Sequence, residues 1–349
     1  MNPRHRRLLI PGLLLALIVV VVVASLIDRA DAAPAEPLVT VSDSRITESS
    51  GLVVSAEHDD LAYTVNDSGN APEVFAIDLT TGEVVGVTTV RADLRDVEAL
   101  ALRDGRLWIG DVGDNDAVRD DIALHVIDEP GRAGGTVDAQ RFPVALAGGP
   151  ADVEALLAPA GSDRLHLVTK SLGGGSVLSV DVSDLAEDRT ATAEVTATGL
   201  PALVTDGAAS PDGSQVALLS YASLWTIDPE DWTVVGSRAL PPLDQAETVA
   251  FVGEDAVLVG SEGKDSPLYR LSLPAGSASA AAPATVTTEL PKPTPEPSAA
   301  PAGSADDAGF ATDARTVVLG GVGVAAVLGL VVVVALRRAW SGGSRRALR

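Results

Sequence analysis

Short apolar runs separated by polar turn residues fill the middle of this chain, and they recur in five similar stretches. Each stretch opens with an acidic residue followed closely by an apolar run. These residues are Glu48, Glu98, Glu154, Asp206 and Glu247, at intervals of 50, 56, 52 and 41 residues. A period of this size is typical of the four-stranded blades of a β-propeller. The pattern therefore predicts a repeat architecture built from strands.

Further apolar runs follow each opening run and predict the rest of each repeat. The second strands are expected at Leu61–Val65, Leu107–Gly110, Leu165–Thr169, Val216–Ser220 and Ala256–Gly260. The third strands are expected at Val74–Leu79, Ala123–Ile127, Val177–Val182, Leu224–Ile227 and Leu268–Leu273. The fourth strands are expected at Val84–Val90, Arg141–Ala145, Thr192–Ala197 and Val234–Ala239. Asp-rich and Gly-rich turns separate the first and second strands.

The fifth stretch has no fourth strand of its own, and an isolated apolar run, Leu38–Ser42, precedes the first stretch. We expect this run to complete the fifth repeat and so to close the ring. The sequence therefore predicts an all-β fold, a five-bladed β-propeller over residues 38–274. The alternative is a β-sandwich with irregular strands, which five repeats in phase disfavour.

The N-terminal sequence indicates an export signal. Arg4, Arg6 and Arg7 precede the apolar run Leu8–Ile27, and small residues at Ala30 and Ala32 suit cleavage. This order predicts a signal peptide over residues 1–32. The run is also long enough to span a bilayer, so an uncleaved signal anchor is the alternative.

The C-terminus predicts a membrane anchor. Residues 316–336 are apolar and uncharged, and residues 337–349 form a basic tail with five arginines. This order predicts a transmembrane helix whose C-terminal tail is cytoplasmic. The Pro-, Ala- and Ser-rich residues 275–315 predict an extended stalk. The propeller would then lie outside the cytoplasm of a cell-membrane protein, single-pass if the signal is cleaved and two-pass if it is not.

The spacing of small residues inside the anchor bears on its pairing. Gly321, Ala325 and Gly329 lie four residues apart, a pattern that permits a helix-mediated dimer. The ordinary glycine content of membrane helices is the alternative explanation.

Composition removes several classes of function. The net charge is −23 although eight arginines lie in the two terminal tails, so the outer part is strongly acidic and repels nucleic acid. The chain has no cysteine, which excludes disulfides, thiolate catalysis and Cys-based zinc sites. No Gly-x-Ser-x-Gly motif is present either.

The five acidic residues that open the repeats are the first candidate site. The innermost strand of each propeller blade lines the central channel, so these side chains should ring one mouth of it. Crowded carboxylates need protonation, solvation, hydrogen bonds or a cation, and Ca²⁺ suits a set of oxygen ligands. The ring therefore predicts a calcium site. The alternative is structural, with each carboxylate accepting backbone N–H bonds from the neighbouring blade.

Two loops after second strands form a second candidate site. Their polar residues are Asn66, Asp67 and Asn70 in the first loop and Asp111, Asp114 and Asn115 in the second. Such residues supply oxygen ligands, and they also favour tight turns. The equivalent later loops contain Lys170, Tyr221 and Glu262–Lys264. A mixed polar face of this kind predicts a binding surface for a protein or a small ligand.

Residues Asp96–Ala101 and Leu107–Asn115 resemble a pattern in exported bacterial β-propeller proteins of uncharacterised function, and Asn66–Pro72 resembles the matching loop of the preceding blade. The layout is also similar to that of the calcium-activated nucleotidases, or apyrases. That resemblance implies a five-bladed propeller with a central Ca²⁺, a glutamate ring and phosphohydrolase activity.

Two functions follow from these observations. The first is a membrane-tethered, extracytoplasmic binding module with a structural calcium ion. The second is a calcium-dependent propeller hydrolase acting on phosphate or ester bonds. The sequence favours the binding module, because no catalytic set is recognisable and Arg and Lys do not cluster on the candidate face.

Overall fold

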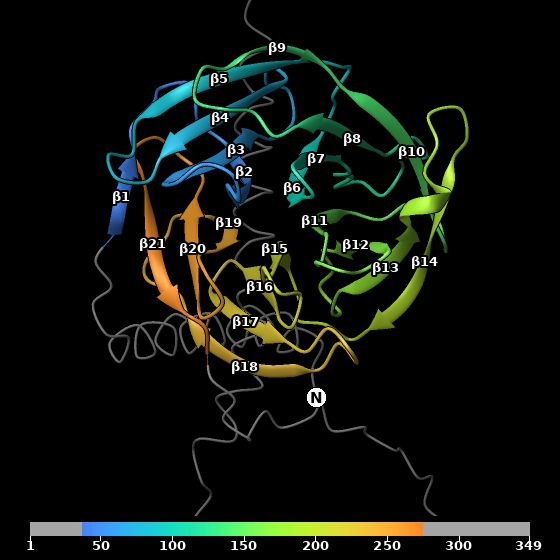
Figure 1. The fold of residues 1–349 in the computed structure, drawn as a ribbon. Helices are drawn as coiled ribbons and strands as arrows, with labels where there is room; N and C mark the ends of the chain where they lie inside the picture. The colour runs from blue at the N-terminus through green and yellow to red at the C-terminus, as the bar shows by residue number, and fades with distance from the viewer. Residues whose placement is uncertain (1–36, 275–349) are drawn as a thin grey trace, which may run out of the picture. The chain divides into compact units, whose positions relative to one another are not determined.

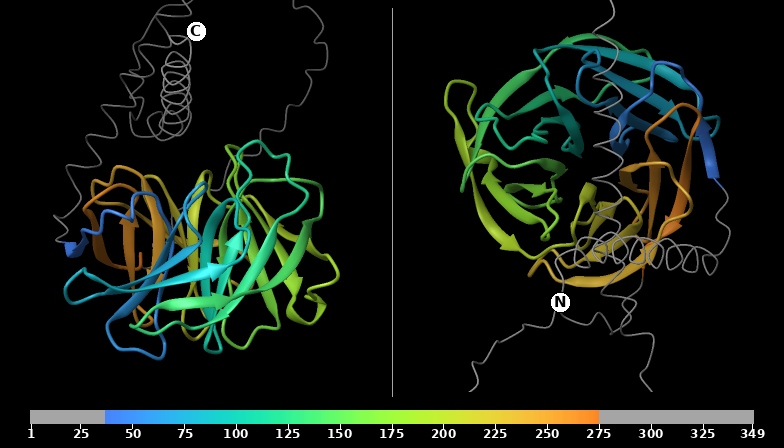
Figure 2. Two further views of the ribbon diagram at one scale, coloured as in Figure 1. Left: turned by 90° about the horizontal axis from the view of Figure 1, so that it is seen from above. Right: turned by 180° about the vertical axis from the view of Figure 1, so that it is seen from behind.

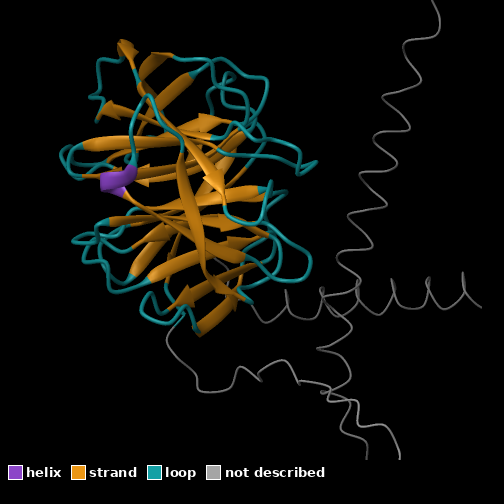
Figure 3. Cartoon of the chain, turned by 90° about the vertical axis from the view of Figure 1, so that its right-hand side faces the viewer, coloured by secondary structure: helices purple, strands orange, loops and turns teal. Residues whose placement is uncertain are grey.

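The computed structural model describes residues 37–274, and the structural statements below concern that range. The chain there is all-β, with one short 3-10 helix, η1 (Val182–Asp184), among its strands (Figure 3). No helix within residues 37–274 is long and apolar enough to cross a membrane. The predicted signal segment 1–32, stalk 275–315, transmembrane helix 316–336 and tail 337–349 lie outside the described residues.

The first sheet follows the chain from the centre outward. Its strands are β2 (Ser49–Val54), β3 (Leu61–Asn66), β4 (Glu73–Asp78) and β5 (Val84–Arg91), with β9 (Gly135–Asp138) added parallel to β5. The sequence did not predict β9, which is short and mostly exposed and so has no apolar period.

The second and third groups of strands form one eight-stranded sheet. The second group is β6 (Val97–Arg103), β7 (Arg106–Asp111), β8 (Ala123–Asp128) and β10 (Gln140–Leu146). The third group is β11 (Val153–Leu157), β12 (Arg164–Thr169), β13 (Ser176–Asp181) and β14 (Ala191–Thr198). Strands β10 and β14 join the two groups as a parallel pair.

Two four-stranded sheets complete the fold. One contains β15 (Val204–Ala209), β16 (Val216–Ser220), β17 (Ser223–Ile227) and β18 (Val234–Ala239). The other contains β19 (Ala246–Phe251), β20 (Ala256–Ser261), β21 (Ser266–Ser272) and, at its outer edge, β1 (Pro37–Val41). The predicted closure is therefore confirmed, because the N-terminal strand β1 pairs with β21 near the end of the described chain.

The strands are arranged around a common centre, as a β-propeller-like fold requires (Figures 1 and 2). The strands nearest the centre are β2, β6, β11, β15 and β19, and each contacts the next, with β19 returning to β2. The outer strands, such as β5, β14 and β18, lie at the rim.

The core is divided among the gaps between successive groups of strands. Within residues 37–274, five hydrophobic clusters are present, and each takes its main side chains from two neighbouring groups. Val41 of β1, for example, packs in the cluster that holds Phe75 of β4 and Leu258 of β20. Each group of strands therefore buries apolar side chains on both faces, and the fold depends on the ring being closed.

A glycine substitution tests that closure. Gly82 lies in the turn before β5 with φ +77°, and a Cβ there would collide with the Thr40 carbonyl oxygen of β1. Gly69 has a similar φ of +81° but faces open space. We expect Gly69→Ala to cost about 1 kcal/mol of stability from backbone strain. Gly82→Ala should cost about 2 kcal/mol more because β1 must shift.

Urea unfolding of the two variants and of the unaltered full-length chain measures the difference. Equal costs for Gly82→Ala and Gly69→Ala would show that β1 does not hold the ring at this contact.

Candidate functional site

All five innermost strands are irregular near their first residues. The pairing of each with its second strand slips by one residue, at Gly51 in β2, Glu98 in β6, Glu154 in β11, Thr205 in β15 and Glu247 in β19. Such a β-bulge leaves one residue out of the pairing and turns its side chain away from the regular alternation. In β6, β11, β15 and β19 the bulged residue is the one that joins the ring described below, whereas in β2 the bulge at Gly51 comes one residue after the ring residue.

The register places three of the five predicted acidic residues at equivalent positions. In four of the five groups the backbone N–H after the second strand donates to the residue two before this position, as Asp67 N does to Glu48 O and Val112 N to Asp96 O; in the group of β15 the bulge at Thr205 marks the position. By this register Glu98, Glu154 and Glu247 correspond, while Glu48 lies two residues earlier and Asp206 one residue later. The expectation of five equivalent carboxylates is corrected here: Ser50 and Thr205 occupy the other two places.

The glutamates of the ring are buried. The exposed fractions of Glu98, Glu154 and Glu247 are 5%, 1% and 4%, whereas Glu48 is exposed. Glu98 Oε2 accepts a hydrogen bond of 3.0 Å from the hydroxyl of Ser50, which also donates to the Glu98 carbonyl. Burial, and after it the nearby Glu154 carboxylate, raises the pKa of Glu98 well above its usual range. The neutral form of this side chain is therefore favoured.

Lys170 supplies a positive charge among these carboxylates. Its Nζ lies 2.8 Å from Glu154 Oε1 and 5.6 Å from the centre of the Tyr221 ring. Burial raises the pKa of Glu154 and Lys170 opposes that rise, while the Glu154 charge raises the pKa of Lys170. Glu154 Oε2 is buried and has no hydrogen-bond partner among the described residues. The ion pair thus satisfies one oxygen of Glu154 and leaves the other unsatisfied.

Glu247 has a different neighbourhood on the other side of the ring. It accepts a hydrogen bond of 2.7 Å from the side-chain amide of Gln245. Burial, and then the nearby Glu262 carboxylate, raises the pKa of Glu247 to about 8. The sequence had grouped Lys170, Tyr221 and Glu262 as equivalent loop residues, and the structure brings all three to this mouth of the channel.

Asp206 acts as a link between two innermost strands. Its Oδ1 accepts a hydrogen bond of 2.7 Å from Gly207 N, and its Oδ2 accepts one of 2.6 Å from Val249 N of β19. Burial raises the pKa of Asp206 well above its usual range, although these two N–H groups oppose the rise. This is the structural role that the sequence offered as the alternative to metal binding.

The first predicted loop is held mainly by its own polar groups. Asn66 Oδ1 accepts from Thr47 N and Glu48 N, at 3.2 and 3.1 Å, and its amide donates to Arg45 O. Asn70 Nδ2 donates to Glu48 Oε2 at 2.8 Å. Asp67 is half-buried, and burial followed by the Glu48 charge raises its pKa to about 7. Asp67 is therefore the member of this loop that extends the acidic mouth.

The second predicted loop is built around Arg119. Its Nη2 lies 2.9 Å from Asp111 Oδ1, and its backbone N–H donates to Asp114 Oδ2 at 2.7 Å. Asp111 and Asp114 are buried, whereas Asn115 is exposed. Two of the three predicted ligands in this loop therefore already hold the loop in place.

Sequence reasoning missed two acidic residues at this mouth, Asp96 and Asp152. Asp152 Oδ1 accepts a hydrogen bond of 2.9 Å from Asp114 N, and burial raises the pKa of Asp96. A side chain at Gly113 would meet Asp96 and Glu98, with a Cβ at 2.6 and 2.7 Å from their nearest atoms. The repeated tripeptide Asp-Val-Glu, at 96–98 and 152–154, is the signal that could have revealed both residues.

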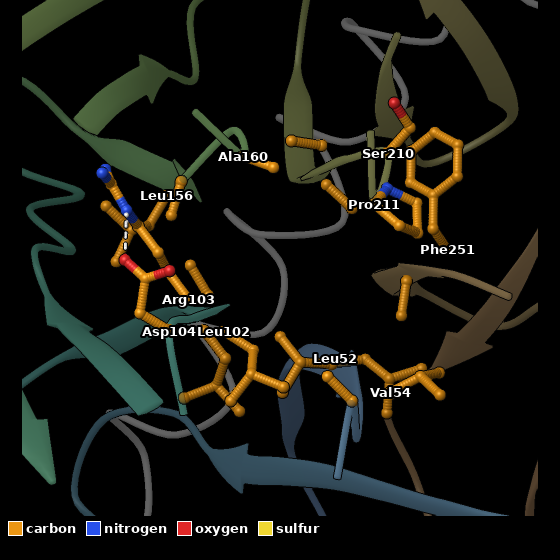
Figure 4. A pocket seen from close by; sticks show the side chains of 18 of the residues that line it. Leu52, Val54, Leu102, Arg103, Asp104, Leu156, Ala160, Ser210, Pro211 and Phe251 are labelled. Carbon is orange, nitrogen blue, oxygen red and sulfur yellow. Dashed lines mark hydrogen bonds and ion pairs between the residues drawn. The ribbon is translucent and has the colours of Figure 1, made fainter. Parts of the chain in front are cut away.

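The other end of the channel is apolar. A hollow of about 290 Å³ is lined where the innermost strands end, by residues such as Leu52, Val54, Leu156 and Phe251 (Figure 4). Arg103 Nε, also at this hollow, lies 3.2 Å from Asp104 Oδ2. The channel therefore has an end rich in carboxylates and a mainly apolar end, where the charged groups are the paired Arg103 and Asp104.

The carboxylate end suits a cation by its chemistry. Hard cations such as Ca²⁺ prefer carboxylate oxygens, and Glu154 Oε2 is a buried oxygen without a partner. As the side chains stand, residues 37–274 contain no group of three or more His, Cys, Asp or Glu side chains arranged to hold a metal ion. The calcium site stays a prediction.

Comparison with known proteins gives weak likenesses. No protein-family model and no curated protein sequence matches this chain. It is similar to a chain in the crystal structure of a nidogen/laminin complex, with a TM-score of 0.39 and 14% identity, over 61% of this chain and 76% of that one. It is also similar to Kuenenia stuttgartiensis hydrazine synthase, with a TM-score of 0.36 and 15% identity, over 63% of this chain and 57% of that one.

The buried carboxyls predict how stability depends on pH. From pH 6.5 up to about pH 7 for Asp67 and about pH 8 for Glu247, the folded chain keeps protons that the unfolded chain, with its ordinary lower pKa values, has released. Stability should therefore fall as pH rises through this window, by up to about 1.4 kcal/mol per pH unit and carboxyl. Below pH 6.5 the buried histidines, whose pKa values are lowered by burial, act in the opposite direction.

Melting curves at several pH values test this dependence. Glu247→Gln should flatten the fall, and Glu57→Gln, a change at an exposed residue, should leave it as it was. A melting temperature that stays level or rises between pH 6.5 and 8 would contradict the assignment.

Removing the ammonium of Lys170 tests its role as counter-ion. Lys170→Met leaves both oxygens of the buried Glu154 without a partner, so we expect a loss of about 3 kcal/mol. Adding Glu154→Gln should recover most of that loss, because neither member of the pair can then carry a buried charge. The measurement is urea unfolding of both variants, with Lys264→Met at an exposed lysine as the control. Additive losses from the two changes would exclude the coupling.

Proposed function

We propose that this chain is a five-bladed β-propeller that serves as a binding module, held on the outer side of a membrane by the apolar segment 316–336. The blade count is supported by five innermost strands, each leading a four-stranded antiparallel group, with β1 as the last strand of the fifth. The outward location rests on the charge and hydropathy of the two chain ends.

The observation that carries the binding role is the buried acidic mouth of the channel. Glu98, Glu154 and Glu247 start three innermost strands, and Asp67 and Glu262 extend the charge outward. Lys170 forms an ion pair with only one of these residues, Glu154. Burial keeps the pKa values of these carboxyls high, because no positive charge faces most of them. A cation in the mouth would lower these pKa values and bind the ionised carboxylates.

We therefore propose a cation as the ligand of this mouth. Ca²⁺ is the cation to test, because it binds to carboxylate oxygens. A catalytic role receives less support. Asp111, Asp114 and Asp206 are engaged in hydrogen bonds that hold loops and strands, so they are not free to act on a substrate.

A calcium titration of the full-length chain tests the proposal. At neutral pH we expect Ca²⁺, relative to EGTA, to raise the melting temperature by roughly 5–10 °C when it exceeds its Kd a hundredfold. Glu98→Gln and Glu247→Gln should each remove most of this rise, while Glu57→Gln should keep it. A melting temperature that does not respond to Ca²⁺ would falsify the calcium assignment.

The hydrolase alternative is decided in the same preparation. Phosphate release from nucleotides that depends on Ca²⁺ and is abolished by Glu98→Gln would replace the binding-module proposal with an enzyme. We expect no such release above the level of the Glu98→Gln variant.

A further inference from the structure

A second polar site lies away from the channel, in a pocket of about 390 Å³ between the end of β5 and the strands β8 and β10. None of its lining residues belongs to an innermost strand. Its charged and polar side chains are Arg91, Asp93, Arg95, Asp111, Asp121, His125 and Arg141. Neither the apolar pattern of the sequence nor the acidic ring predicts a site here.

His125 is the unusual group in this pocket. It lies in the middle of β8, paired with Ile109 of β7 on one side and Arg141 of β10 on the other, so these three side chains share one face of the sheet. Its exposed fraction is 1%, and neither ring nitrogen has a hydrogen-bond partner among residues 37–274. A buried imidazole without a partner is costly, and a ligand that accepts its N–H would remove that cost.

The arginines around the pocket differ in their pairing. Arg91 lies 2.6 Å from Asp138, Arg95 lies 2.7 Å from Asp121, and Arg119 lies 2.9 Å from Asp111. Arg141 has no ion pair within the described part of the chain, and its one hydrogen bond there is a long one of 3.3 Å to the Asp121 carbonyl. One guanidinium without a counter-charge therefore lies beside one imidazole without a partner.

We infer that this pocket binds a small oxyanion, a carboxylate or a phosphate, between Arg141 and His125. A guanidinium donates two parallel hydrogen bonds to such a group, and a neutral imidazole donates one more. Asp93 is exposed at the rim and repels a second negative charge. The pocket should therefore hold a singly charged oxyanion more tightly than a doubly charged one.

The test uses the full-length chain with two probes, acetate and inorganic phosphate, each against chloride at equal ionic strength. We expect a saturable rise in melting temperature at millimolar concentration, and a matching change in the ¹⁵N shifts of the His125 ring. Arg141→Gln should weaken binding at least tenfold. Arg164→Gln, at an exposed strand arginine paired with Asp181, should leave it unchanged. Asp93→Asn should strengthen the binding of phosphate more than that of acetate.

Each outcome bears on the inference. A rise that is the same in Arg141→Gln and Arg164→Gln would mean that the anions act on the protein as a whole, and the site would be rejected. The absence of any rise with both probes would reject it too. Because Arg141 is exposed, its substitution spares the core, and the His125 signal reports binding even where stability changes little.

Discussion

Closure of the ring is the constraint on which the rest of this structure depends. Each group of strands buries apolar side chains on both faces, so a group at an open end would leave one face in water. The pairing of β1 with β21 prevents this, and Val41 completes the cluster between the first group and the last. The chain ends of the described region are thus tied together, in a protein that has no cysteine to tie them.

Closure also determines where charge gathers. The innermost strands start at one end of the channel, so any side chain at their first positions is repeated around a narrow ring. Glu98 and Glu154 occupy successive strands, and Lys170 lies against Glu154. Ser50 and Thr205 take the two remaining places and donate to the backbone of the next strand instead. Hydroxyl groups at these two places therefore reduce the electrostatic repulsion within the ring and add hydrogen bonds between neighbouring innermost strands.

The strands were predictable from the sequence because short apolar runs between polar turns indicate buried strands, and β1 was predictable because one repeat lacked a strand. The register of the acidic residues was not predictable. Glu48 and Asp206 look equivalent to Glu98 in an apolar pattern, but that pattern does not show how each innermost strand pairs with its second strand. The pairing places Glu48 two residues before the ring position and Asp206 one residue after it. Strand β9 and the pairing of β10 with β14 were not predicted, because both depend on contacts between different repeats.

The oxyanion pocket could not be predicted from the sequence for the same reason, since it depends on how separate strands pair. His125 and Arg141 belong to two different strands, β8 and β10, and only the pairing of these strands brings the two side chains to one face. The lack of an ion pair at Arg141 is also a property of the fold, since three neighbouring arginines pair with the aspartates Asp111, Asp121 and Asp138. The two candidate sites thus differ in origin. The acidic mouth arises because the repeats place carboxyls at equivalent positions, whereas the pocket arises because Arg141 is left without an ion pair.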